Sequence, residues 1–97
     1  MTTNDFIAKT NIKMLKEALK DLEAKEAAAN VAEMAYDKEP ENPEAEKAFD
    51  EAYKLEFAAF IVAANILAAW VEVDAKTARA VISGKRAELW EILNRAA

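Results

Sequence analysis

The chain has 97 residues, of which 54% are hydrophobic, and its net charge is −5. It holds one glycine, two prolines, no cysteine and no histidine. So few turn-forming residues exclude a β-sandwich or an α/β sheet and predict one all-α domain over residues 1–97. The missing Cys and His exclude disulfides, zinc fingers, thiol nucleophiles and histidine bases. The acidic balance disfavours non-specific attraction to nucleic acid and anionic membranes.

The first predicted helix covers residues 2–38. Thr2 and Asp5 form a Thr-x-x-Asp pattern, typical of a helix start with Thr2 as the N-cap. An apolar stripe at helical spacing follows, made of Ile12, Leu15, Leu19 and Leu22. Alanines after position 24 leave room for a second helix to approach closely.

A linker over residues 39–43 leads to a second helix over residues 43–72. Pro40 disfavours helical backbone at Glu39 and ends the first helix. Asn42 followed by Pro43 predicts the N-cap and first position of the second helix. Together the two helices predict a long antiparallel hairpin. The main apolar seam of the second helix is predicted to be Phe49, Tyr53, Phe60, Ala64, Leu67 and Val71.

From Leu55 onward the second helix is apolar nearly all round. Its apolar run over residues 57–71 is shorter than the roughly 20 residues that a membrane-spanning helix needs. We therefore expect a buried central helix and no membrane partner. One neighbouring helix cannot cover it on every side, so the C-terminal segment, a second copy of the chain, or both must do so. This predicts a homo-oligomer.

Two short helices are predicted over residues 74–97. Asp74 is the expected N-cap of the first, which Gly84 ends as a left-handed C-cap. The second begins near Lys85 and completes a helical bundle. Trp70 and Trp90 lie in apolar helical patterns and are expected to anchor the core. Residues 73–97 carry five basic and three acidic side chains, so a mildly basic segment follows an acidic body.

Residues 67–86 combine a Leu67-Ala68 pair, a Val73-Asp74 opening and a Ser83-Gly84-Lys85-Arg86 end. The segment resembles a helix-turn-helix of the lambda-repressor-like, or Xre, family of DNA-binding domains. The resemblance implies that its second helix enters a major groove of double-stranded DNA. The implied base or phosphate contacts are Lys76, Thr77, Arg79, Lys85 and Arg86. We expect Val71, Val73 and Val81 to fill the wedge between the two motif helices.

The segment also departs from the family. Glu72 occupies the turn position that the family usually gives to glycine, Ala64 stands where a glutamine is frequent, and no break precedes the first motif helix. The same residues have a purely structural interpretation. Gly84 is then a helix cap, Lys85 and Arg86 complement a helix dipole, and Lys76 and Arg79 form a solvated face.

Three functions remain open. The first is a small cytoplasmic DNA-binding regulator that dimerises through its acidic hairpin. The second is an acidic adaptor or inhibitor, of the kind that phages and mobile elements encode, which competes with nucleic acid for a basic partner protein. The third is a structural oligomerisation unit.

We expect no enzyme activity, no cofactor and no metal. The carboxylates near the linker lack the spacing of a calcium loop; they are Glu39, Glu41, Glu44 and Glu46. The first residues lack the basic and apolar regions of a signal peptide, so we expect a cytoplasmic location.

Overall fold

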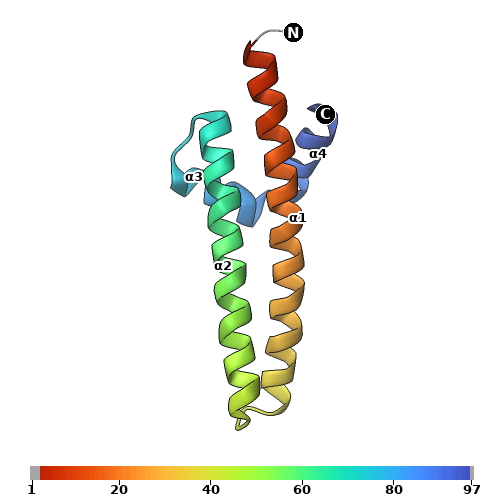
Figure 1. Cartoon of the computed structure of the whole chain (residues 1–97), viewed down its shortest axis with the longest axis vertical. Helices are drawn as coiled ribbons and strands as arrows, with labels where there is room; N and C mark the ends of the chain where they lie inside the picture. The colour runs from red at the N-terminus through yellow and green to blue at the C-terminus, as the bar shows by residue number, and fades with distance from the viewer. Residues whose placement is uncertain (1–2, 97) are drawn as a thin grey trace.

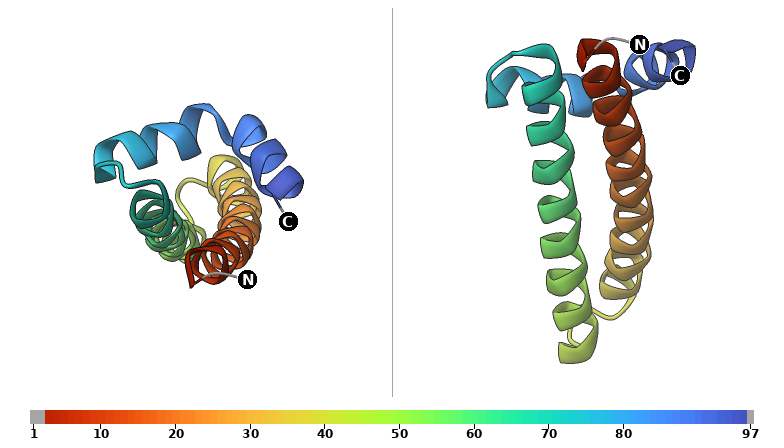
Figure 2. Two further views of the ribbon diagram at one scale, coloured as in Figure 1. Left: turned by 90° about the horizontal axis from the view of Figure 1, so that it is seen from above. Right: turned by 45° about the horizontal axis from the view of Figure 1, so that its top comes forward.

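The protein is an all-α helical bundle, shown in Figure 1 as a computed structural model that describes residues 3–96. Its elements are α1 (Thr3–Lys38), α2 (Pro43–Val71), α3 (Ala75–Gly84) and α4 (Arg86–Ala96). The helices α1 and α2 form a long antiparallel hairpin, and α3 and α4 lie beside its upper half. Seen from above, α3 and α4 follow one side of the hairpin and leave the other side bare (Figure 2). The predicted fold class and hairpin are confirmed.

The predicted helix boundaries agree closely with the structure, because local chemistry sets them. The side chain of Asn42 caps α2 by accepting a hydrogen bond of 2.9 Å from the Glu44 N–H, and Pro43 is the first helical residue. Asp74 caps α3 in the same way, through a 2.7 Å hydrogen bond from the Thr77 N–H. The N-cap predicted at Thr2 lies outside the described residues.

The left-handed residue of the C-terminal region is Glu72 and not Gly84. Glu72 has φ 56° and ψ 47° and ends α2, and its N–H donates to the carbonyl of Ala68. Gly84 has no positive φ, so the prediction of a left-handed glycine cap is wrong. Lys85 is the C-cap of α3 instead, and its N–H donates a hydrogen bond to the Val81 carbonyl. Left-handed backbone costs a non-glycine residue roughly 1–2 kcal/mol, so the turn after α2 is strained.

The core lies between the hairpin helices and under α3 and α4. The predicted stripe of α1 is buried as expected, with Leu15 and Leu19 fully enclosed. Half-buried Trp70 and Trp90 pack against this core, which confirms them as anchors. The buried members from the other helices are Ala59, Ala63, Ala64, Leu67, Ala78, Ile82, Leu89 and Leu93.

The predicted seam of α2 is only partly correct. Ala64 and Leu67 are buried, but Tyr53 and Val71 are exposed. The buried residues of α2 also include Ala59 and Ala63, which lie one turn apart. Alanine takes less room than the aromatic residues of the predicted seam, of which Phe49 and Phe60 are half-buried.

Candidate functional site

The α2–turn–α3 unit has the short connection that a helix-turn-helix requires. Residues 72–74 join α2 to α3, and the left-handed residue is Glu72, at the turn position that the family usually gives to glycine. The helix before the turn does not break, because α2 is continuous from Pro43 to Val71. The expected wedge is not formed. Val71 and Val73 are exposed and only Val81 is half-buried, so the contact between the helices is made by Ala78 and Ile82.

The five predicted DNA contacts differ in how free their side chains are. Lys76 and Lys85 are exposed and form no ion pair with any residue in the described part of the chain. Arg79 is exposed, but its Nε donates to the Ala75 carbonyl within the same helix, at 3.3 Å. The backbone N–H and the side chain of Thr77 both form hydrogen bonds with Asp74, the N-cap of α3.

Arg86 is the least available of the five. It is half-buried at the start of α4, and its guanidinium forms an ion pair with Glu26 of α1. Its Nε also donates to the Ile82 carbonyl at 3.1 Å, which satisfies a backbone group at the C-terminal end of α3. These bonds give Arg86 a structural role, holding the junction of α3 and α4 against α1.

Hydrogen bonds from the Thr77 side chain and N–H lower the pKa of the Asp74 carboxyl below its usual value of 3.8. A group whose pKa is lowered by folding stabilises the folded state above its unfolded pKa, and this contribution disappears as the pH falls. We therefore expect the melting temperature of the wild type to fall relative to that of Asp74→Asn below about pH 3.8. Thermal unfolding of both proteins between pH 7 and pH 2 measures this, and a constant difference would contradict it.

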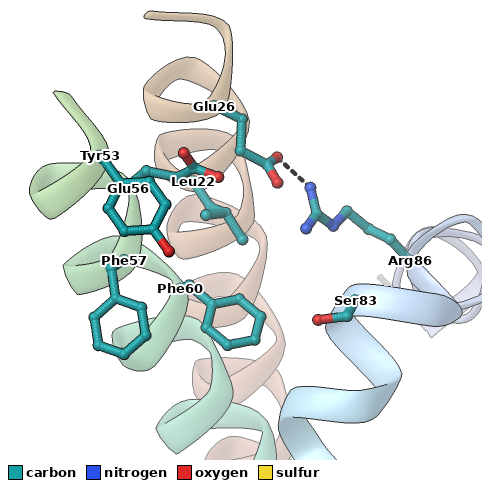
Figure 3. Close-up of a pocket in the computed structure, with 8 residues that line it drawn as sticks. All are labelled: Leu22, Glu26, Tyr53, Glu56, Phe57, Phe60, Ser83 and Arg86. Carbon is teal, nitrogen blue, oxygen red and sulfur yellow. Dashed lines mark hydrogen bonds and ion pairs between the residues drawn. The ribbon is translucent and has the colours of Figure 1, made fainter. Parts of the chain in front are cut away.

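A hollow of about 290 Å³ lies on the loop side of α3, where all four helices contribute residues (Figure 3). We call it the groove below α3. Its apolar lining includes Leu22 of α1 and Phe60 of α2, with Tyr53 and Phe57 on the more exposed rim. The Glu26–Arg86 ion pair closes the groove on the α4 side. Sequence patterns did not reveal this groove, because it forms only where the junction of α3 and α4 meets the hairpin.

The side of the hairpin turned away from α3 is covered by no other described helix (Figure 2), and we call it the open face. On α2 three exposed apolar side chains on this side follow one line at seven-residue spacing: Leu55, Val62 and Ala69. The exposed polar residues Glu51 and Asn65 lie within one turn of this line. Val62 lies two positions after Phe60, so its side chain points about 200° around the helix axis from that of Phe60. Because Phe60 lines the groove below α3, Val62 points away from that groove. On α1 the exposed Met14 and Ala28 and the half-buried Ala18 and Ala32 recur at helical spacing, and we expect this stripe on the same side of the hairpin. Asp21 and Lys25, which also belong to it, neutralise each other across 3.1 Å.

Charge is separated along the molecule, whose longest dimension is 57 Å. Residues 21–56, which run to and from the loop, hold twelve carboxylates and only four lysines. The first half of α1 is lysine-rich at helical spacing, through Lys9, Lys13, Lys16 and Lys20. The loop end is therefore strongly negative and the opposite end is mildly positive.

Of the described helices, α2 alone is long and apolar enough to cross a membrane by length and composition, and little of its apolar part is buried. That part, residues 57–71, spans about 22 Å at a rise of 1.5 Å per residue. The hydrocarbon core of a bilayer is roughly 30 Å thick. The apolar run of residues 57–71 is therefore shorter than the thickness of that core.

Within residues 3–96 no three His, Cys, Asp or Glu side chains are grouped in a way that suits a metal ion. The linker carboxylates point into solvent as expected, and Asn42 donates to one of them, Glu39, at 2.9 Å. Comparisons of the chain with protein families, with characterised proteins and with solved structures gave no match. The resemblance of residues 67–86 to the Xre family therefore remains a prediction from the sequence.

Proposed function

We propose that the protein is a helical interaction module that assembles with a second copy of itself through the open face. The observation that carries this proposal is the exposed line of Leu55, Val62 and Ala69 on α2, which α3 and α4 leave uncovered. Contiguous exposed apolar surface on a small protein marks a site of association.

The size of the open face suits a stable dimer. The 29 residues of α2 extend about 43 Å, and two packed helices are about 20 Å wide. The resulting area is close to the roughly 800 Å² that each partner contributes to a standard interface. Its centre is rich in alanine, so two such faces can approach closely.

The charge separation favours an antiparallel pair. A parallel pair sets two strongly negative loop ends side by side, which costs repulsion energy. In an antiparallel pair that sets Leu55 of one copy against Val62 of the other, the lysine-rich half of α1 lies along the acidic half of the second copy. The second copy therefore complements the open face in shape, polarity and charge.

The test is the mass of the protein over a concentration series, measured by light scattering or sedimentation, for wild type, Val62→Glu and Tyr53→Glu. Val62 and Tyr53 lie on opposite sides of the same helix and are 54% and 58% exposed. We expect Val62→Glu to be monomeric where the wild type and Tyr53→Glu are dimeric, because only Val62 lies in the interface. If the wild type remains monomeric at high concentration, the proposed self-association is wrong.

The orientation has its own test, because the chain has no cysteine of its own. A mixture of Leu55→Cys and Val62→Cys is oxidised, and the cross-linked species are identified by mass. An antiparallel pair gives the mixed 55–62 product, whereas a parallel pair gives 55–55 and 62–62 products.

DNA binding through α3 is the second candidate, and the left-handed turn at Glu72 is the observation that favours it. The short connection before α3 and the free side chains of Lys76 and Lys85 support the same function. The antiparallel pair turns its two α3 helices to opposite sides, so each copy would engage a duplex separately.

Binding to a labelled duplex of about 25 base pairs at rising salt tests this second function, because phosphate contacts weaken steeply with salt. We expect Lys85→Ala and Lys76→Ala to weaken binding without loss of folding, and Arg86→Ala to lower stability instead, since Arg86 is held by Glu26. Binding equal to wild type in both lysine variants would exclude a role for α3 in DNA recognition.

A further inference from the structure

The groove below α3 continues toward the loop as a surface with aromatic and acidic side chains. On α2 the exposed residues Glu46, Asp50, Tyr53 and Phe57 recur at intervals of four, three and four, so they share one side of the helix. On α1 the residues Glu26, Glu33 and Asp37 recur at intervals of seven and four. Tyr53, Phe57 and Glu26 line the groove (Figure 3), which places both stripes on this side of the hairpin. We call this surface the acidic–aromatic face.

The acidic–aromatic face has an excess of negative charge around an apolar centre. The guanidinium of Arg86, which lines the groove, is already paired with Glu26. Glu56 lines the groove and has no ion-pair partner in the described part of the chain. The aromatic centre consists of Phe57, which is 54% exposed, with Tyr53 and Phe60 beside it. An apolar side chain of a partner can therefore enter the groove, and basic side chains beside it can pair with carboxylates on both α1 and α2.

We propose that the acidic–aromatic face docks a basic amphipathic helix of another protein. Such a helix presents an apolar stripe to the groove and lysines or arginines to the two acidic stripes, which is the helix-in-groove mode of recognition. All described elements around the groove are helices, so it offers no sheet edge to an extended peptide. The carboxylates repel nucleic acid and anionic lipid, so the charge selects a cationic protein segment.

This inference goes beyond the proposed self-association and does not depend on it. Tyr53 of the acidic–aromatic face and Val62 of the open face are nine positions apart on α2, so they point about 180° from each other around the helix axis. An antiparallel pair therefore leaves both copies of the acidic–aromatic face accessible, and a monomer presents the same surface.

The probe is a fluorescently labelled 18-residue amphipathic helical peptide of leucine and lysine, titrated with the full chain and followed by anisotropy. We expect saturable binding that weakens as salt rises, because the charge contacts are exposed to solvent. Two control peptides accompany it: one of the same composition in scrambled order, and an amphipathic peptide of leucine and glutamate. Neither control is expected to bind comparably.

Three variants locate the site. Phe57→Ser removes the apolar anchor point and is expected to weaken binding about tenfold. The double variant Glu33→Gln/Asp37→Asn is expected to weaken it and to flatten its dependence on salt. Ile92→Ser, a matched control on α4 with 53% exposure against 54% for Phe57, is expected to bind as wild type does.

Each other outcome counts against the proposal. Absence of binding, comparable binding of either control peptide, or wild-type affinity in both Phe57→Ser and the double variant would overturn it. Far-ultraviolet circular dichroism verifies that each variant is folded. The double variant replaces only exposed side chains, so it still tests the site if Phe57→Ser proves unstable.

Discussion

Replacing Leu19 with alanine is expected to lower the free energy of unfolding by about 3 kcal/mol. Leu19 is fully buried in the middle of α1, in the core that α1 shares with α2. The substitution removes three buried carbon atoms and leaves a cavity that the long, regular helices are poorly able to fill by relaxation. Urea unfolding followed by circular dichroism measures the change.

Val31→Ala is the matched control for this prediction. Val31 belongs to the same helix, loses two carbon atoms on substitution and is 69% exposed. We expect its effect to stay within about 0.5 kcal/mol of zero, because little buried contact is lost and alanine favours the helix. A similar loss in both variants would mean that Leu19 is not in the core.

Replacing Ile82 with alanine is expected to lower the free energy of unfolding by about 2–4 kcal/mol and to loosen α3. Ile82 is fully buried, and with Ala78 it forms the buried surface of this ten-residue helix. A helix so short is not stable by itself in water, so it depends on this contact. Hydrogen exchange is the informative readout, because it reports each helix separately.

In Ile82→Ala we expect faster amide exchange throughout α3 and little change in the hairpin near the loop. Val81→Ala is the matched control, since Val81 is the neighbouring apolar residue and is only half-buried. Its expected loss is about 1 kcal/mol, with α3 still protected. Uniformly faster exchange in all four helices would show that α3 and the hairpin unfold as one unit.

Self-association and binding of the basic peptide are expected to respond differently to Ile82→Ala. The open face and the acidic–aromatic face below α3 both belong to the hairpin, so a loosened α3 leaves self-association largely intact. The groove below α3 also includes Ser83 and Arg86 of the C-terminal helices. Ile82→Ala is therefore expected to weaken binding of the basic peptide while the protein remains a dimer.

The sequence by itself determined the four helices and most of their ends. Each of these features follows from chemistry within a few residues: Asn42 and Pro43 begin α2, Asp74 begins α3, and Pro40 follows the end of α1. The apolar stripe of α1 was equally readable, because it contrasts with charged residues on the other faces. In contrast, the left-handed residue was misplaced at Gly84, since glycine permits that conformation without requiring it.

Only the tertiary structure decided which sides of the helices are covered. From Leu55 onward α2 is apolar on nearly every side, so its periodicity could not show that Ala59 and Ala63 are buried while Val62 faces solvent. The same holds for contacts between residues far apart in the sequence. Arg86 forms an ion pair with Glu26, and the indole N–H of Trp90 donates to Glu23 at 2.6 Å. Such contacts depend on where α3 and α4 lie against the hairpin, which is fixed by the fit of Ala78 and Ile82 onto α2 and of Leu89 and Leu93 onto the core.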